Sequence, residues 1–213
     1  RGGGGGGGGA GHDQALSRKL SRLLRHSAVE EGVAIRADGY VALNDVFALP
    51  RFKGFSLDQV RAVVADNDKK RFGLLEEDGK VWIRANQGHS MNVVQSSLLL
   101  EQVDLASIAT CLHGTNMDAW NAIKAQGLRR MGRNQIHFAE GLPGESGVIS
   151  GMRRSAQVLI YLNTAAAAAA GLVMMRSAND VLLTAGFDVG GINGIIPPCL
   201  FSKVVHRATG NLI

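Results

Sequence analysis

The sequence predicts an α+β protein made of two lobes, and three observations support this prediction. Residues 13–90 contain amphipathic helical patterns followed by a turn signal between two β-type runs. After residue 90, short β-type runs alternate with glycine-rich loops. The charge also changes, because residues 1–106 carry 14 Lys and Arg against 13 Asp and Glu, whereas residues 107–213 carry 9 against 5. The second lobe therefore has few acids, which favours a site for phosphates over one built on carboxylates.

The composition limits the classes of protein that fit. The 213 residues are 46% hydrophobic, which is enough for two small cores. Eight consecutive glycines at positions 2–9 cannot bury side chains, so we expect residues 1–12 to form a disordered tail. We expect no membrane span, because no stretch reaches about 18 uncharged apolar residues. We expect no secretory signal, because the N-terminus is rich in glycine and is not a basic segment followed by an apolar block. Since Cys111 and Cys199 do not make a disulfide framework, we expect an intracellular protein of the cytoplasm or nucleus.

The first helical pattern covers residues 13–28 and separates apolar from basic side chains. Its apolar face consists of Leu16, Leu20, Leu23 and Leu24. The opposite face carries Arg18, Arg22 and Arg25, with His26 at its edge. This spacing predicts a helix that packs through its leucines and presents its arginines to solvent or to an anion.

Two further helices are predicted in the first lobe. Residues 39–46 indicate a short strand that leads into a helix capped by Asn44 or Asp45. Residues 55–64 form a second amphipathic pattern, for which Ser56 is the expected cap.

A hairpin signal completes this lobe. Asp78-Gly79 stands between β-type runs at residues 72–75 and 80–84, and Asp-Gly is a strong two-residue hairpin turn. Three helices followed by a β-hairpin predict a winged-helix lobe over residues 13–90.

The rest of the chain predicts an α+β lobe with curved antiparallel sheets over residues 91–213. It contains four β-type runs, at residues 109–113, 135–138, 158–162 and 181–184. One helix is expected between Met117 and Gln126, with Gly127 closing it.

Several common chemistries have no motif in this sequence. No Lys is followed by Ser or Thr, so there is no Walker A phosphate loop. There is no Gly-x-Gly-x-x-Gly after a predicted strand, no Gly-x-Ser-x-Gly and no His-Glu-x-x-His. Cys111 and His113 lack further ligands at a useful spacing, so we expect no metal.

Four segments remain as candidate sites, and each has a plainer reading. Arg25-His26 combines a guanidinium that can pair with phosphate oxygens and an imidazole that titrates near neutral pH. The alternative is that both residues belong to a solvated basic face of the helix. Residues 84–90 place Arg84 and several donors after a strand, or simply connect two lobes. His113-Gly114-Thr115 ends a strand before a helix whose start favours a diphosphate, or holds a structural histidine. Residues 127–138 set three arginines beside His137, or form an exposed basic loop.

Taken together and in this order, these segments resemble the NAD-dependent RNA 2′-phosphotransferase family, also called tRNA 2′-phosphotransferases. The similarity extends from about Leu16 to Val205. It is strongest in residues 16–26, 84–90, 113–115, 133–138 and 177–184. The resemblance implies an N-terminal winged-helix lobe that binds RNA and a C-terminal ADP-ribosyltransferase-like lobe that binds NAD as a co-substrate.

The resemblance also assigns roles to individual residues. The catalytic set it implies is Arg25, His26, Arg84 and Arg133. The NAD-binding residues it implies are His113, Gly114, Thr115, His137, Ser177 and Val181. We expect RNA to be bound by Arg18, Arg22, Gln87, His89 and Ser90. We expect the partner to be an RNA with an internal 2′-phosphate, a tRNA splicing intermediate. We expect a monomer that binds no metal and does not associate with a membrane.

The implied reaction is removal of the 2′-phosphate left at a tRNA splice junction. The phosphate attacks the anomeric carbon of the nicotinamide ribose, which gives a 2′-phospho-ADP-ribosyl RNA and releases nicotinamide. A ribose hydroxyl then attacks phosphorus, giving 2′-hydroxyl RNA and ADP-ribose 1″,2″-cyclic phosphate. Protein-modifying relatives often carry Glu where this sequence has Val181. A phosphate that is already an anion needs no such base.

Two other functions use the same features. An ADP-ribosyltransferase of terminal nucleic-acid phosphates would share the first step and stop there, whereas a non-catalytic winged-helix RNA-binding protein would release no nicotinamide. The sequence also departs from the family at Ala165–Ala170, at Asp180 where Gly is common, and in the glycine-rich loop of residues 190–194.

Overall fold

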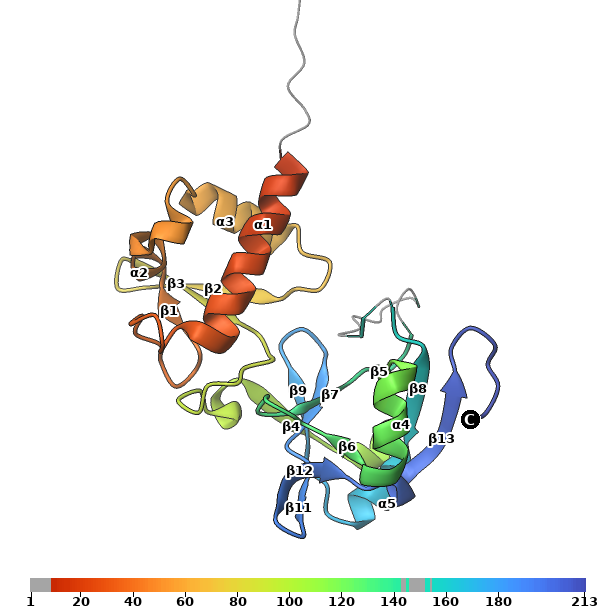
Figure 1. Ribbon diagram of the computed structural model, residues 1–213. Coiled ribbons are helices and arrows are strands. Elements are labelled where there is room, and N and C mark those ends of the chain that lie inside the picture. The colour runs from red at the N-terminus through yellow and green to blue at the C-terminus, as the bar shows by residue number, and fades with distance from the viewer. Residues whose placement is uncertain (1–8, 143–144, 146–151, 154) are drawn as a thin grey trace, which may run out of the picture. The chain divides into compact units, whose positions relative to one another are not determined.

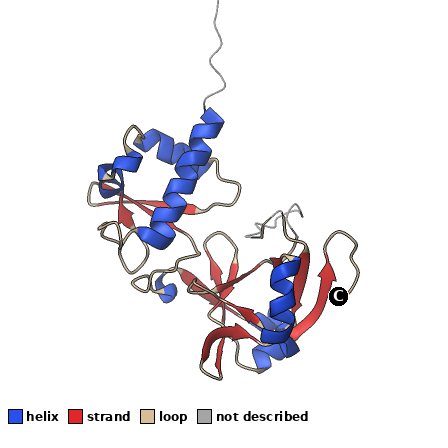
Figure 2. Ribbon diagram, in the orientation of Figure 1, coloured by secondary structure: helices blue, strands red, loops and turns tan. Residues whose placement is uncertain are grey.

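The computed structural model describes residues 9–142, 145, 152–153 and 155–213, which belong to two compact units, residues 1–98 and 99–213 (Figure 1). Figure 2 shows helices concentrated in the first unit and strands in the second, so the mixed α/β prediction with antiparallel sheets is confirmed. Within the part of the chain that the structure describes, every helix is too short or too polar to span a bilayer.

The first unit extends past the boundary that we expected at residue 90. The amide of Ser90 donates to the Arg25 carbonyl at 2.9 Å, and the amide of Gln95 donates to the Ala37 carbonyl at 2.8 Å. These backbone bonds attach residues 90–95 to the first unit, which ends at Leu98 after a short turn, η3 (Ser96–Leu98).

The first helix, α1 (Gly9–Arg22), starts four residues before the expected position and continues into a π-helical turn, η1 (Leu23–Ser27). The amide of Ala28 donates to the Leu23 carbonyl at 3.0 Å, which closes the wider turn. All four leucines of the predicted apolar face are fully buried, so the predicted orientation of this helix is confirmed.

Helix capping in this unit follows the prediction once and departs from it once. Ser56 caps α3 (Leu57–Ala65) in a complete capping box with Gln59. Helix α2 (Leu43–Ala48) is followed by a 3₁₀ turn, η2 (Pro50–Phe52), and the Asn44 or Asp45 cap was wrong. Ala42 is the N-cap without a side-chain bond, because the chain leaves the sheet at Ala42 and becomes helical at Leu43.

The sheet of the first unit has the order β1-β3-β2 and is antiparallel throughout. Its strands are β1 (Val41–Ala42), β2 (Phe72–Glu77) and β3 (Lys80–Ala85). The hairpin between β2 and β3 turns at Asp78 and Gly79, which have φ values of +52° and +69°. Positive φ at both positions is the geometry that the Asp-Gly signal predicted.

The described residues of the second unit form three antiparallel sheets, with strand orders β4-β9-β10-β7, β11-β12-β6 and β13-β8-β5. The first sheet consists of β4 (Leu100–Val103), β7 (Ile136–Phe138), β9 (Met174–Ser177) and β10 (Leu182–Thr184). The second consists of β6 (Leu128–Arg129), β11 (Phe187–Val189) and β12 (Ile192–Ile196). The third consists of β5 (Leu112–Thr115), β8 (Val158–Leu162) and β13 (Phe201–His206).

Helices are few in this unit. They are α4 (Met117–Gln126), α5 (Thr164–Ala169) and the 3₁₀ turns η4 (Leu105–Ser107) and η5 (Pro198–Leu200). Helix α4 has the predicted bounds, and Gly127 ends it with φ +84°, where a Cβ would lie 2.7 Å from the Ile196 carbonyl. The alanine run forms α5, which Asn163 caps, and Ala167 packs into the largest described core of the unit.

Candidate functional site

The first unit gathers five predicted site residues into one group, which we call the cationic cluster. Its members are Arg25, His26, Arg84, His89 and Ser90. They come from the end of the first helix, the end of β3 and the segment after β3. Residues far apart in the sequence therefore share one location within this unit.

The π-helical turn sets the direction of Arg25 and His26. Leu23, Leu24 and Ser27 of this turn are buried, whereas Arg25 is half-buried and His26 is exposed. A wider turn changes which side chains face the core, and such turns are frequent at functional sites. Here it lets two consecutive polar residues face away from the leucine core.

Arg84 is oriented by a carbonyl and an aromatic ring. Its Nη1 lies 3.4 Å from the Asp38 carbonyl oxygen, and its guanidinium carbon lies 4.7 Å from the centre of the Tyr40 ring. Neither partner neutralises the guanidinium, and within the described ranges Arg84 forms no ion pair with a carboxylate. The side chain is thus held in place with its positive charge intact.

His89 lies behind these cations and is only 4% exposed. Burial, together with the charges of Arg25, His26 and Arg84, lowers its pKa to about 4. His89 is therefore neutral at pH 7. Its Nε2 is buried and has no hydrogen-bond partner among the residues that the structure describes. Gly88, just before it, has φ +89° and allows the sharp change of direction beside Arg25.

Ser90 joins this segment to His26. The Ser90 Oγ lies 2.9 Å from His26 Nδ1 and 3.5 Å from the Arg25 carbonyl oxygen, to which it donates. Together with the backbone bond from the Ser90 amide, these contacts hold Arg25-His26 against the segment that follows β3.

The residues predicted to bind RNA differ in accessibility. Arg18 and Arg22 are exposed on α1, as the helical pattern predicted. Gln87 and His89 are 8% and 4% exposed, so their side chains offer little surface to a nucleic acid.

In the second unit, His113 and His137 lie on neighbouring strands β5 and β7. The Nδ1 of His113 donates to the His137 carbonyl at 2.8 Å, because a carbonyl can only accept. Burial lowers the pKa of His113, the His137 carbonyl opposes this effect, and the charge of Arg133 adds to it. His113 is thus neutral, with its lone pair on Nε2, and that atom can accept a hydrogen bond from a hydroxyl.

The two residues after His113 are shaped by packing within the unit. A Cβ on Gly114 would lie 2.3 Å from Met152 Cγ and 3.0 Å from Ala156 Cβ, so a larger residue here would displace the Met152 side chain. Thr115 is half-buried, and its carbonyl accepts from the amide of Gln157.

The start of α4 already has internal partners. Asn116 Oδ1 accepts from the amide of Ala119 at 2.7 Å, and Gln157 Oε1 accepts from the amide of Met117 at 3.2 Å. We expected this helix start to favour a diphosphate, and two of the amides needed for that are used within the unit.

Arg133 lies in the loop between β6 and β7, and its charge interacts with that of Arg153, an unpredicted cation in the segment between β7 and β8. Burial and the charge of Arg153 lower the pKa of Arg133, which still remains charged at neutral pH. Two arginines that repel each other gain from an anion placed between them. Met131 in the same loop is 80% exposed and has φ +55°, an unusual conformation for a residue other than glycine.

Ser177 and Val181 form the ends of the turn between β9 and β10. The Ser177 hydroxyl accepts a hydrogen bond from the Val181 amide at 3.1 Å. As a donor it can reach Asn179 Oδ1 at 2.8 Å and the Val181 carbonyl oxygen at 3.2 Å. Val181 is fully buried, and Asp180 has φ +56°. The left-handed conformation explains why glycine suits position 180, and aspartate tolerates it better than most residues.

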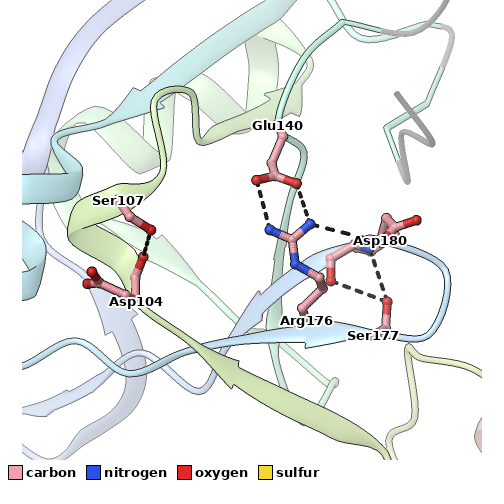
Figure 3. A network of polar contacts seen from close by, with 7 residues as sticks. Asp104, Ser107, Glu140, Arg176, Ser177 and Asp180 are labelled. Carbon is pink, nitrogen blue, oxygen red and sulfur yellow. Dashed lines mark hydrogen bonds and ion pairs between the residues drawn. The ribbon is translucent and has the colours of Figure 1, made fainter. Parts of the chain in front are cut away.

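An ion pair holds this turn beside the end of β7 (Figure 3). Glu140 accepts two hydrogen bonds from Arg176, at 2.5 and 2.9 Å, and Asp180 lies 3.9 Å from the same guanidinium. Figure 3 also shows Ser107, whose hydroxyl donates to the Asp104 carbonyl in the turn η4. The hydrogen bond to Glu140 raises the pKa of Arg176.

Sequence reasoning missed the residues that orient or face the predicted site residues. They are Asp38, Tyr40, Glu140, Arg153 and Arg176. No local pattern pairs these residues with partners so distant in the sequence. Among the residues described, no group of three or more His, Cys, Asp or Glu side chains could hold a metal ion. Burial and nearby Glu140 raise the pKa of Cys111, which keeps that thiol protonated.

Comparison with known proteins identifies the family. Residues 11–186 match the family described as RNA 2′-phosphotransferase, Tpt1 / KptA family. The chain is 44% identical over 194 residues to tRNA 2′-phosphotransferase 1 of Danio rerio, covering 90% of this chain and 84% of that protein. It is 35% identical over 209 residues to tRNA 2′-phosphotransferase of Saccharomyces cerevisiae, covering 94% and 86%.

A third relative is longer than this chain. The putative tRNA 2′-phosphotransferase of Schizosaccharomyces pombe is 43% identical over 189 residues, which cover 88% of this chain but 50% of that protein. The chain therefore belongs to the RNA 2′-phosphotransferase family, a family of transferase enzymes.

Proposed function

We propose that this protein removes the 2′-phosphate from a tRNA splice junction and transfers it to an ADP-ribose derived from NAD. The observation that carries the proposal is the cationic cluster, in which Arg25, His26 and Arg84 surround one neutral, buried histidine. Such a cluster favours a doubly charged phosphate over any neutral group. Arg133 completes the proposed catalytic set, and Arg18 and Arg22 are proposed to contact the RNA backbone.

We assign the two units to different parts of the reaction. The first unit is proposed to be a winged-helix lobe that binds the phosphorylated RNA. The second is proposed to be an ADP-ribosyltransferase-like lobe that binds NAD through His113, Gly114, Thr115, His137, Ser177 and Val181. His113 fits this role, because its Nε2 lone pair can accept a hydrogen bond from a ribose hydroxyl.

The NAD proposed to bind the second unit supplies a reactive anomeric carbon, with nicotinamide as the leaving group. In the first step an oxygen of the RNA 2′-phosphate forms a bond to that carbon as the bond to nicotinamide breaks. The nucleophile is already charged, so this step requires positioning and no general base.

The second step places more demand on the first unit. The neighbouring ribose hydroxyl forms a bond to phosphorus, the bond between phosphorus and the RNA 2′-oxygen breaks, and that oxygen takes up a proton. The products are 2′-hydroxyl RNA and ADP-ribose 1″,2″-cyclic phosphate. Arg25, Arg84 and Arg133 are proposed to stabilise the charge on phosphorus, and His26 to carry the proton from the attacking hydroxyl to the departing oxygen.

The test is to incubate the full chain with NAD and an RNA that carries one radiolabelled internal 2′-phosphate. We expect nicotinamide and a labelled cyclic phosphate in equal amounts. A stable ADP-ribosylated RNA without the cyclic product would instead indicate a transferase that modifies phosphates and stops after one step. Binding of the RNA without nicotinamide release would indicate a non-catalytic RNA-binding protein.

Variants separate the two steps. Arg84→Ala and His26→Ala are expected to accumulate the 2′-phospho-ADP-ribosyl RNA, because the second step depends on them more than the first does. Arg61→Ala is the matched control, since Arg61 lies in the same unit and is paired with Glu76 at 2.7 Å. If either active-site variant blocks nicotinamide release while RNA still binds, the division of roles is wrong.

A further inference from the structure

Ser90 is attached to Arg25-His26 through both its backbone and its side chain. Its amide donates to the Arg25 carbonyl at 2.9 Å, and its Oγ lies 2.9 Å from His26 Nδ1. The same Oγ donates to the Arg25 carbonyl over a longer distance of 3.5 Å. Ser90 is therefore placed to orient the His26 ring.

The Arg25 carbonyl offers the Ser90 hydroxyl an acceptor other than His26. A carbonyl oxygen has two lone pairs and can accept from both the amide and the hydroxyl of Ser90. When the hydroxyl hydrogen points to that carbonyl, the Ser90 Oγ has only lone pairs to offer to His26. The Nδ1 of His26 must then carry a hydrogen and donate it.

We infer that Ser90 is a positioning residue that holds His26 in the tautomer protonated on Nδ1, so that Nε2 is the atom that exchanges protons. His113 in the second unit is held in the same tautomer by the His137 carbonyl. A hydroxyl at Nδ1 orients the ring as a carboxylate would, but adds no negative charge beside a bound phosphate. The charged and titratable groups beside His26 in this cluster are Arg25, Arg84 and His89, and His89 is neutral at pH 7.

This inference rests on the proposed function, because it supplies the mechanism for proton transfer in the second step. The Nε2 lone pair of His26 takes the proton from the attacking ribose hydroxyl as the new oxygen–phosphorus bond forms. The same Nε2 returns that proton to the RNA 2′-oxygen as its bond to phosphorus breaks. The hydrogen on Nδ1 stays with Ser90 throughout, so one atom both accepts and donates.

The tautomer can be measured without any activity. Long-range nitrogen–proton NMR spectra of the uniformly nitrogen-15-labelled full chain, recorded above the pKa of the ring, distinguish a protonated Nδ1 from a protonated Nε2. We expect Nδ1 to be protonated in the wild type and in Ser90→Thr, and Ser90→Ala to move the hydrogen toward Nε2. The control is Ser56→Ala, which removes a helix cap in the same unit and is expected to leave the His26 signals unchanged.

A wild-type spectrum with Nε2 protonated, or an unchanged spectrum in Ser90→Ala, would overturn the inference. The wild-type spectrum tests the tautomer even if Ser90→Ala does not fold. Thr keeps the hydroxyl, so loss of the signal pattern in a folded Ser90→Thr would also contradict it.

Kinetics supply the second measurement. Decay of isolated 2′-phospho-ADP-ribosyl RNA is expected to slow about tenfold in Ser90→Ala, the usual effect of one lost hydrogen bond, and to stay within about twofold of the wild type in Ser90→Thr. Normal decay in His26→Ala would refute the role of His26 in the proposed function, while the NMR result on Ser90 would stand. Normal decay in Ser90→Ala together with slow decay in His26→Ala would refute the role of Ser90 alone.

Discussion

Two arginines, one in each unit, are held in opposite ways. In the first unit, the guanidinium of Arg84 contacts the Asp38 carbonyl and the face of the Tyr40 ring, and both partners leave its charge intact. In the second unit, Arg176 donates two hydrogen bonds to the Glu140 carboxylate and lies near Asp180. The first arrangement orients a guanidinium and leaves it charged, whereas the second neutralises the guanidinium and stabilises a turn.

The partner that holds an arginine distinguishes a candidate anion-binding residue from a structural one better than a count of the arginines in each unit does. A guanidinium that already has a carboxylate would have to lose that partner before it could bind a phosphate. A guanidinium held by a carbonyl or a ring has nothing comparable to lose. The comparison therefore predicts that removal of Arg84 impairs catalysis and that removal of Arg176 impairs stability.

The largest expected effect is that of Arg84→Ala on the second step. Loss of one oriented donor to a charged transition state costs about 3–4 kcal/mol, or about 10²–10³ in rate. Arg84→Lys should not restore the rate, because an ammonium cannot make the two parallel contacts of a guanidinium. Single-turnover decay of the intermediate measures this effect, and melting temperatures show whether the variants are folded.

Arg176→Ala tests the other side of the comparison. It should lower the melting temperature and leave the rate of the second step in the folded enzyme within about threefold, because the pair it breaks holds a turn and not a phosphate. If Arg176→Ala slows decay of the intermediate as much as Arg84→Ala, the contrast between the two arginines is wrong.

His89 gives the next largest effect, and it acts on stability. Its pKa is about 4 in the folded protein and 6.5 in the unfolded chain. Between these values the unfolded chain binds the extra proton, so the free energy of unfolding rises with pH from about 4 to 6.5 and is fully regained above 6.5. The difference between the two pKa values corresponds to a loss of about 3 kcal/mol in the free energy of unfolding once the pH falls below 4.

Urea unfolding at pH 7 and pH 4.5 measures this dependence. His89→Gln removes the titrating group, so the variant should lose less stability between pH 7 and pH 4.5 than the wild type. The pKa of His113 is also lowered, but His113 contributes equally in the wild type and in the variant. An NMR titration of His89 in the wild type provides a direct check, and a pKa near 6.5 would contradict the prediction.

The sequence predicted features that depend on neighbours along the chain. The Asp78-Gly79 hairpin, the Ser56 cap and the end of α4 at Gly127 were all predicted, because each depends on residues within a few positions. The Asn44 or Asp45 cap failed, because pairing of β1 with β3 decides where α2 begins.

The candidate site shows the same limit. Residue types marked Arg84 and His26 as candidates, and the resemblance added their roles. The contacts of Arg84 with Tyr40 and of His26 with Ser90 join segments that only the fold brings together. Burial of Gln87 and His89 was equally invisible, since both are polar residues that sequence patterns place on the surface.

Tyr40 sharpens the comparison, because its ring is what orients Arg84. Tyr40→Leu removes the aromatic face and should lower the rate of the second step by about tenfold, the effect of a lost cation–π contact of about 1–2 kcal/mol. Tyr40→Phe keeps the face and should stay within about twofold of the wild type. Equal rates for Leu and Phe would show that the ring does not orient Arg84.

The smallest effect is expected at Asp180, in the turn that Arg176 stabilises. Asp180 has φ +56°, so Asp180→Ala keeps a Cβ in the left-handed region but loses the polar group that offsets its strain, and it should cost about 1 kcal/mol of unfolding free energy. Asp180→Gly relieves the strain, but it gives up the 3.9 Å contact with Arg176 and loosens the unfolded chain, so the net change should be below about 0.5 kcal/mol. Urea unfolding of both variants tests this order. If glycine destabilises as much as alanine, then the pairing with Arg176, and not the backbone conformation, determines which residue position 180 tolerates.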